Sequence, residues 1–313
     1  MLLRKLWKDL TGRRDMPSAP RPFGDRIGQS IPRISIVDVG AMAEGVERYH
    51  GLVESGLAQV TGFEPNPAER ARLATRGGPY RYLPEFLGDG REAIFHETRY
   101  PGCASLLAPD PRSIDLFTTL GCASTKGNFH VERTHRVQTT RMDDLGDDLL
   151  VDFLKLDIQG AELDVLRHGT AKLESTLVIE CEVEFVALYR DQPLFGDVQC
   201  FLRDRGFALH KLVDVSGRPF SPFVPANPFV PISQILWADA VFIRDFTRLE
   251  RYSDEALLKA AAILDVVYGS YDLAALLLGE YDRRRGTGCR ARYMEGLGAE
   301  PISGACLNIR QRP

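Results

Sequence analysis

Three acidic residues directly follow short apolar runs, where the chemistry of a parallel sheet is usually found. Asp38 lies in VDVGA, Glu64 in GFEPNP and Asp157 in LKLDIQGAE. In open α/β sheets, ligands bind beyond the carboxyl ends of the strands. Carboxylates at that edge can accept hydrogen bonds from a ligand's hydroxyl groups or act as general bases. The three acids therefore predict a ligand site at one edge of a sheet.

Gly40 and Glu64 have the spacing of a nucleoside site. A glycine after the first strand lets the backbone come close to a ligand, and a helix can begin there. Glu64 stands 24 residues after Gly40, the usual position of a carboxylate that binds ribose hydroxyls. The loop contains only Gly40 and Gly45, not the G-x-G-x-x-G fingerprint of dinucleotide sites. We therefore expect a ribose but no diphosphate. The alternative is that Asp38 and Glu64 only cap helices or solvate loops.

Strand-like and helix-like segments alternate from residue 33 onwards, and they must position these acids. Apolar runs predict strands at 33–39, 59–63, 80–87, 152–158, 177–183 and 207–213; helical spacing predicts helices at 45–55, 68–73, 161–167 and 197–205. This alternation indicates an α/β fold, a doubly wound and mostly parallel sheet with helices on both faces. A last run at 238–244 follows a Pro-rich loop at 219–231. Without a crossover helix, that run is expected to insert antiparallel.

The two ends of the chain differ from this pattern. Residues 1–14 form a basic amphipathic segment, expected to dock on the protein body, with peripheral contact to an anionic membrane as the alternative. The prolines of 15–32 predict a linker. Residues 253–268 and 272–284 predict a helical hairpin with Ser253 as N-cap, covered by the sheet domain or by a second copy in a homo-oligomer. From Gly286 we expect loose structure. The predicted domains are 1–32, 33–247 and 248–313.

Composition limits the class of protein. The 313 residues include 39 Lys and Arg against 43 Asp and Glu, a net charge of −4, which disfavours nucleic acid as a partner. The six cysteines form no C-x-x-C pair, so reduced thiols and a cytoplasmic location are expected. No run of eighteen apolar residues occurs, so no transmembrane segment is expected, and the amino-terminal segment lacks the features of a signal peptide.

The sequence resembles the FkbM-type family of S-adenosylmethionine-dependent methyltransferases. The likeness covers about residues 33–245 and rests on VDVGA at 37–41, GFEPNP at 62–67, DFLKLDIQGAELDVLRHG at 152–169, IECEVEFVALYRDQPLF at 179–195 and LWADAVFIRD at 236–245. It implies a Rossmann-like class I methyltransferase sheet of seven strands, the last one antiparallel, and S-adenosylmethionine as cofactor. It departs from many family members at 42–44, where a small polar residue and a close glycine are usual.

The resemblance also assigns roles to single residues. It implies that Asp38, Gly40 and Ala41 hold the methionine end of the cofactor and that Glu64 binds the ribose. The adenine would lie against Leu87, Gly88 and Asp89, and Asp157 would face the reacting centre.

Elementary chemistry agrees with such a cofactor. A sulfonium cation with an ammonium group favours a pocket rimmed by carboxylates, which Asp38 and Asp157 would supply. Methyl transfer to oxygen depends on near-attack geometry and on a base that removes the acceptor's proton. Asp157 is the leading candidate for that base, followed by Glu180 and Glu182. Alternation along the strand also puts Glu184 on their face, so a solvated strand end is the alternative reading.

Metal chemistry has little support in the sequence. The six histidines sit in no recognisable site motif, and His130 and His135 are five residues apart in an extended run, so they would point to opposite faces. We therefore expect no zinc site. Asp157 and another carboxylate could still bind Mg²⁺.

These features favour an S-adenosylmethionine-dependent O-methyltransferase that acts on a hydroxyl of a sugar, glycan precursor or secondary metabolite. The loops at 102–106 and 188–193 are expected near the ligand, with Tyr189 and Arg190 as candidate acceptor contacts. An NAD-dependent oxidoreductase is the alternative on the same fold, disfavoured by the missing glycines. A non-catalytic nucleotide-binding or scaffold protein is the alternative from another class.

Overall fold

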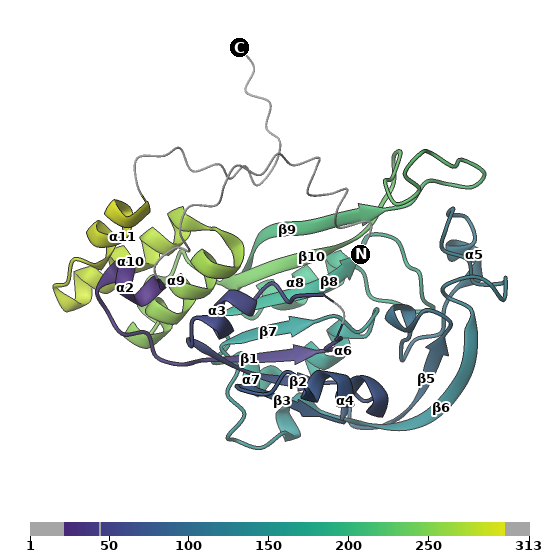
Figure 1. The fold of residues 1–313 in the computed structure, drawn as a ribbon, viewed down its shortest axis with the longest axis horizontal. Helices are drawn as coiled ribbons and strands as arrows, with labels where there is room; N and C mark the ends of the chain where they lie inside the picture. Colours follow the sequence, from purple (N-terminus) through teal and green to yellow (C-terminus); the bar gives the residue numbers. More distant parts are fainter. Residues whose placement is uncertain (1–21, 44, 298–313) are drawn as a thin grey trace, which may run out of the picture.

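A seven-stranded sheet forms the centre of the computed structural model, which describes residues 22–43 and 45–297 (Figure 1). Its order is β3-β2-β1-β7-β8-β10-β9. The strands are β1 (Ile34–Val39), β2 (Ala58–Phe63), β3 (Tyr80–Leu83), β7 (Phe153–Leu156), β8 (Val178–Glu184), β9 (Phe207–Gly217) and β10 (Ile235–Arg244). Strands β3, β2, β1, β7 and β8 pair in parallel with their neighbours, whereas β10 pairs antiparallel with both β8 and β9. The predicted α/β sheet and its antiparallel last strand are confirmed.

Helices cover both faces of the sheet. The helices that follow the strands are α3 (His50–Glu54), α4 (Pro67–Ala74), α6 (Glu162–Arg167), α7 (Thr170–Leu173) and α8 (Phe195–Arg203). Apolar residues of β1, β7 and β8 alternate between two buried cores, so Val39 and Leu154 pack with α6 and α8 while Ile36 and Phe153 face the other side. This alternation is the period-two pattern of a strand that is covered on both faces.

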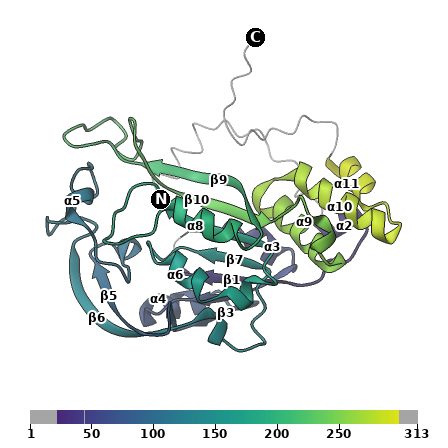
Figure 2. The ribbon, with the colours of Figure 1, turned by 180° about the vertical axis from the view of Figure 1, so that it is seen from behind.

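The carboxyl-terminal helices pack against the second of these faces, beside the amino ends of the strands (Figures 1 and 2). They are α9 (Asp254–Tyr268), α10 (Tyr271–Arg285) and α11 (Cys289–Leu297), joined by the short α2 (Phe23–Ile27). The hairpin of α9 and α10 confirms the prediction, and the Ser253 hydroxyl accepts a hydrogen bond from the Ala256 amide as an N-cap. The hairpin thus shares one apolar core with the sheet.

Two expectations about irregular ends were wrong. The segment after Gly286 forms α11, because Cys289 and Tyr293 are fully buried and the Tyr293 hydroxyl donates to Asp265. The predicted linker contains α2, whose Phe23 and Ile27 enter the same core. In both segments tertiary packing outweighs a weak local preference. The predicted amphipathic segment at 1–14 lies outside the described residues.

Two central elements also differ from prediction. The helix expected at 45–55 is limited to α3, since Gly45 has φ of +88°, which a helix cannot contain. The strand expected at 80–87 divides into β3 and β4 (Phe86–Leu87). Strand β4 joins a separate three-stranded sheet with β5 (Glu92–Thr98) and β6 (Val131–Thr140), a hairpin that the sequence analysis did not foresee.

Short helical segments complete the connections. They are η1 (Pro101–Cys103), α5 (Pro111–Ile114), η2 (Met142–Asp144) and η3 (Leu249–Arg251). Among the described residues, no helix combines the length and the apolar character that crossing a membrane requires.

Candidate functional site

The loop after β1 lies directly against the loop after β7. Gly40 has φ of +86°, and a Cβ atom there would come within 2.0 Å of the Asp157 carbonyl oxygen. The Gly40 amide also donates to the carbonyl of Phe63, the last residue of β2. The carboxyl ends of β1, β2 and β7 therefore meet at Gly40, as expected for the ligand edge of such a sheet.

A row of charged residues crosses this part of the sheet. Asp38, Lys155 and Glu180 occupy paired positions on β1, β7 and β8. Lys155 Nζ lies 3.3 Å from Asp38 Oδ1 and 3.8 Å from Asp157 Oδ2. Burial lowers the pKa of Lys155, but the nearby carboxylates, Asp38 first, outweigh this and hold the pKa well above its usual value. A fixed cation therefore stands between the two carboxylates expected to attract a cationic cofactor.

Both carboxylate oxygens of Asp38 have hydrogen-bond partners within the protein. Its side chain is fully buried, and the Tyr49 hydroxyl donates to its Oδ2 over 2.6 Å. With Lys155 on its other oxygen, each oxygen of Asp38 has a partner within the protein. The same carboxylate, after burial itself, helps to raise the pKa of Glu47 to about 7. Asp38 thus holds the loop after β1 in place.

Glu180 is held by two partners from distant parts of the chain. Its Oε2 accepts hydrogen bonds from Arg48 Nε at 3.1 Å and from the Tyr268 hydroxyl at 2.6 Å. Arg48 also pairs with Asp239 at 2.5 Å and with Asp214 at 3.1 Å. Burial, with Glu180 as the next cause, raises the pKa of Asp239 to about 7. Arg48 thereby connects the loop after β1 to β8, β9 and β10.

Gln159 joins the two remaining candidate acids. Its Nε2 donates to Asp157 Oδ1 at 3.1 Å and to Glu182 Oε2 at 2.5 Å, while the Tyr189 hydroxyl donates to its Oε1 at 3.3 Å. Burial first, and then Asp157, raises the pKa of Glu182 well above its usual value. Glu182 therefore favours the protonated form. By contrast, the Asp157 side chain is 40 % exposed and accessible from the edge.

Glu64 closes the opposite side of the site at the end of β2. Its Oε1 accepts from the Asn66 amide at 2.6 Å, and its Oε2 has no hydrogen-bond partner among the described residues. Burial raises the pKa of Glu64 to about 7. On the same strand Gly62 leaves room for the Tyr82 ring, since a Cβ atom there would come within 2.5 Å of it. A buried carboxylate with one free oxygen fits a ligand that supplies hydroxyl donors.

The segment predicted to contact adenine lies beyond Glu64, at β4. Leu87 is buried, and Gly88 packs on Thr139 of β6. Asp89 Oδ1 accepts from the Arg91 amide at 2.8 Å and from the Thr139 hydroxyl at 3.3 Å. Asp89 therefore stabilises its own turn, and the apolar Leu87 is the member of this segment best suited to a planar base.

The two predicted acceptor contacts have different environments. Tyr189 is 1 % exposed, and its hydroxyl proton is shared between the Cys103 carbonyl at 2.9 Å and Gln159 Oε1 at 3.3 Å. Arg190 is exposed, and its amide donates to the Ala108 carbonyl. The Ser105 hydroxyl donates to the Gln159 carbonyl at 2.8 Å, which brings the predicted 102–106 loop to this edge.

Sequence reasoning missed the partners that organise the acids: Lys155, Arg48, Gln159 and Tyr268. Only Lys155 had a signal, a lysine inside an otherwise apolar strand, next to an acid at its end. Buried lysines are rare unless they are paired, so such a residue predicts a carboxylate on a neighbouring strand. No group of three His, Cys, Asp or Glu that could hold a metal ion occurs within the described ranges.

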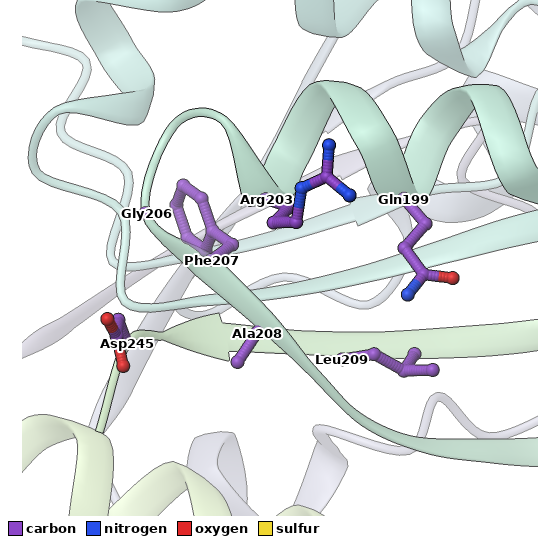
Figure 3. A pocket seen from close by; sticks show the side chains of 7 residues that line it. All are labelled: Gln199, Arg203, Gly206, Phe207, Ala208, Leu209 and Asp245. Atoms are coloured by element: carbon purple, nitrogen blue, oxygen red, sulfur yellow. The ribbon is translucent and has the colours of Figure 1, made fainter. Parts of the chain in front are cut away.

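Two cavities lie away from this edge. One, of about 510 Å³, lies between α8 and the amino end of β9, where it is lined by Arg203, Phe207 and Asp245 (Figure 3). The other, of about 740 Å³, contains Asp152 and Lys259, which form an ion pair of 3.1 Å. Both open at the amino ends of strands, opposite to Gly40, so neither coincides with the candidate site.

Comparison with known proteins gives one family and several solved structures of similar fold. The family described as Methyltransferase FkbM domain matches residues 38–209. No curated protein matches the chain. Similar solved structures include a TehB-like SAM-dependent methyltransferase from Corynebacterium glutamicum, with 10 % identity, 78 % of this chain and 96 % of that chain covered, and a TM-score of 0.33. A putative methyltransferase from Thermoplasma acidophilum has 13 % identity, with 75 % and 79 % covered and a TM-score of 0.34.

Proposed function

The chain belongs to the FkbM methyltransferase family and uses S-adenosylmethionine, and from this premise we propose that it methylates a hydroxyl oxygen of a sugar, glycan precursor or secondary metabolite. The observation that carries the proposal is the accessible Asp157 carboxylate, which lies 3.8 Å from Lys155 Nζ, on a residue whose backbone carbonyl meets the Gly40 loop. A hydroxyl acceptor must lose its proton during transfer, and a positioned carboxylate can take it.

The residues at the sheet edge fit the cofactor. We assign its methionine end to the loop of Asp38, Gly40 and Ala41, its ribose to Glu64, and its adenine to the segment of Leu87, Gly88 and Asp89. The close approach of Gly40 to Asp157 and the free oxygen of Glu64 support this assignment. When bound, the cofactor supplies a methyl group on a sulfonium, a good leaving group.

The surroundings of the three candidate bases differentiate their roles. Glu180 accepts from both Arg48 and Tyr268, which suits a positioning role. Glu182 has its pKa raised by burial, and Gln159 holds it, so it favours keeping its own proton. Asp157 is left to receive the acceptor proton at a carboxylate oxygen. Lys155 Nζ lies beside this carboxylate, 3.8 Å from Asp157 Oδ2.

We assign the chemistry to residues 33–247 and treat 248–313 as an extension, of which α9, α10 and α11 pack on the sheet domain. Lys259 of α9 pairs with Asp152 of the sheet, and the two regions share an apolar core, which supports a stabilising role for the extension. The proposal also includes a cytoplasmic location and assembly of the chain as a homo-oligomer.

A methyl-transfer screen tests the proposal. The purified protein is incubated with S-adenosylmethionine carrying a labelled methyl group and with matched acceptors that offer a hydroxyl, an amine or an activated carbon. We expect label on hydroxyl acceptors only, as a methyl ether identified by fragmentation in the mass spectrometer. Label on nitrogen or carbon, with none on oxygen, would refute the oxygen acceptor while leaving the family assignment intact.

A further inference from the structure

The loop between β9 and β10 carries a large exposed apolar surface. It projects beyond the ends of these strands in both ribbon views (Figures 1 and 2). Its most exposed large apolar residues are Phe223 at 65 %, Val224 at 73 % and Ile232 at 63 %, with Phe229 and Val230 each at 53 %. Isolated apolar residues on a surface are ordinary, but a cluster of five on one loop marks an interaction site.

The loop emerges at the edge that carries the candidate site. Strand β10 runs antiparallel to β8 and pairs Trp237 with Glu184, so the start of β10 lies at the carboxyl end of β8. At the base of the loop the Phe220 ring stacks on Phe117 with centroids 4.7 Å apart, and the Ser221 amide donates to the Leu116 carbonyl. An anchored base therefore presents an apolar tip on the acceptor side of the enzyme.

The tip has no charged group to solvate. Residues 219–235 contain no Asp, Glu, Lys or Arg. The nearest charge in the sequence, Arg218, lies at the base of the loop, with its guanidinium 4.8 Å from the Trp237 ring centre and 5.2 Å from that of Phe229 in the tip. Its Nη1 donates to the Gly217 carbonyl at 2.7 Å. A surface that offers aromatic and aliphatic side chains without charge matches the polar–apolar boundary of a bilayer.

The backbone of the tip is also suited to a medium poor in water. Proline occurs at every third position, at Pro219, Pro222, Pro225, Pro228 and Pro231, and proline has no amide hydrogen to desolvate. The amides of Phe223 and Val230 donate to the carbonyls of Phe220 and Asn227, and that of Phe229 donates to the Asn227 side chain. Since unpaired amides are costly in lipid, these features lower the cost of insertion.

We propose that the tip of this loop, residues 223–232, inserts into the interfacial layer of a lipid bilayer and holds the carboxyl edge of the sheet at the membrane surface. A lipid surface needs no shape complementarity, which suits a projecting loop without charged residues. The inference goes beyond the proposed function and holds for any methyl acceptor. It differs from the electrostatic contact that residues 1–14 could make, because the tip requires no anionic lipid.

Cosedimentation of the full chain with sucrose-loaded vesicles of pure phosphatidylcholine tests this inference. The neutral lipid removes the electrostatic attraction of the basic residues 1–14. The test variant is the double substitution Phe223→Ser and Val224→Ser, with Ile232→Ser as a second, single variant. The matched control is Leu150→Ser, because Leu150 is 59 % exposed but precedes β7 at the opposite edge. Calorimetric binding of S-adenosylmethionine shows that each variant is folded.

We expect the wild type and the control to bind neutral vesicles equally and independently of salt. The double variant should lose about tenfold or more in partition coefficient, and Ile232→Ser should lose less. Absence of binding to neutral vesicles, or binding only to anionic vesicles that salt abolishes, would overturn the inference. So would light-scattering evidence that the wild type dimerises without lipid and that the loop variants do not, since the tip would then bind a second copy.

Discussion

The hydroxyl of Tyr268 donates a 2.6 Å hydrogen bond to Glu180 Oε2 and so ties the last residue of α9 to the middle of the central sheet. Glu180 is 3 % exposed, and Arg48 from the loop after β1 binds the same oxygen. The carboxyl-terminal hairpin therefore contributes a polar contact beside the candidate site in addition to its apolar packing.

Loss of the Tyr268 hydroxyl should destabilise the fold. Tyr268→Phe keeps the ring but removes one donor from a buried carboxylate, which we expect to cost about 1–3 kcal/mol of unfolding free energy. Chemical denaturation measures it. Tyr271→Phe is the matched control, since the Tyr271 hydroxyl makes no hydrogen bond among the described residues. Equal stability of both variants would contradict a role for the Tyr268 contact.

Alanine substitutions at Gly40 and Gly45 separate the effect of close packing from the effect of backbone strain. Their φ angles are +86° and +88°, but only at Gly40 would a Cβ atom meet another group, the Asp157 carbonyl. Each alanine substitution should incur about 1–2 kcal/mol of strain. We expect Gly40→Ala to weaken S-adenosylmethionine by about tenfold more than Gly45→Ala in calorimetry, because it separates the loops after β1 and β7. Equal losses would mean that Gly40 has no special contact.

Glu64 should make cofactor binding depend on pH. Its pKa of about 7 means that acid protonates the carboxylate and removes an acceptor from the ribose. Affinity for S-adenosylmethionine should therefore fall as the pH drops through 7, and Glu64→Ala should weaken it by about tenfold or more. Titrations from pH 5.5 to 8.5, a range of about 3 units around that pKa, test this. Unchanged affinity in a folded variant would remove Glu64 from the site.

Titration of Glu64 should also change the stability of the free protein, with a pH dependence opposite to that of cofactor affinity. An acid whose folded-state pKa lies above its unfolded value binds more protons when folded, so the free protein loses stability as the pH rises from about 4.5 to 7. Glu64→Gln abolishes that titration. Its unfolding free energy relative to the wild type should therefore increase over this window, in denaturation without cofactor. A difference that is constant with pH would contradict the burial of a charged Glu64.

The carboxyl edge was predictable because it depends on local signals. Apolar runs that end in Asp38, Glu64 and Asp157 define where three strands stop. The alternation of strands and helices predicts that these strands are parallel, so that their carboxyl ends share one edge. The pairing of Lys155 with Asp38 was not predictable, since it depends on the register between β1 and β7. Register becomes visible only when the strands are assembled.

Other elements could not be predicted because tertiary contacts decide them. Helix α11 has a polar sequence, and the burial of Tyr293 holds it in place. Strand β6 of the hairpin with β5 is mostly exposed and carries several charges, so it lacks the apolar alternation that identifies a strand. The contacts of Asp38 with Lys155 and Tyr49 were likewise not predictable, because they depend on how the strands and the loop after β1 pack.

The most direct test of the central claim is the rate of methyl transfer by Asp157→Asn at saturating S-adenosylmethionine and hydroxyl acceptor. The amide keeps the shape of the side chain but cannot accept a proton. If Asp157 is the base, the rate should fall by about 100-fold or more, a much larger loss than that of the calorimetric affinity for S-adenosylmethionine. A retained rate with weakened cofactor binding would contradict the account and make Asp157 a residue that only positions the cofactor.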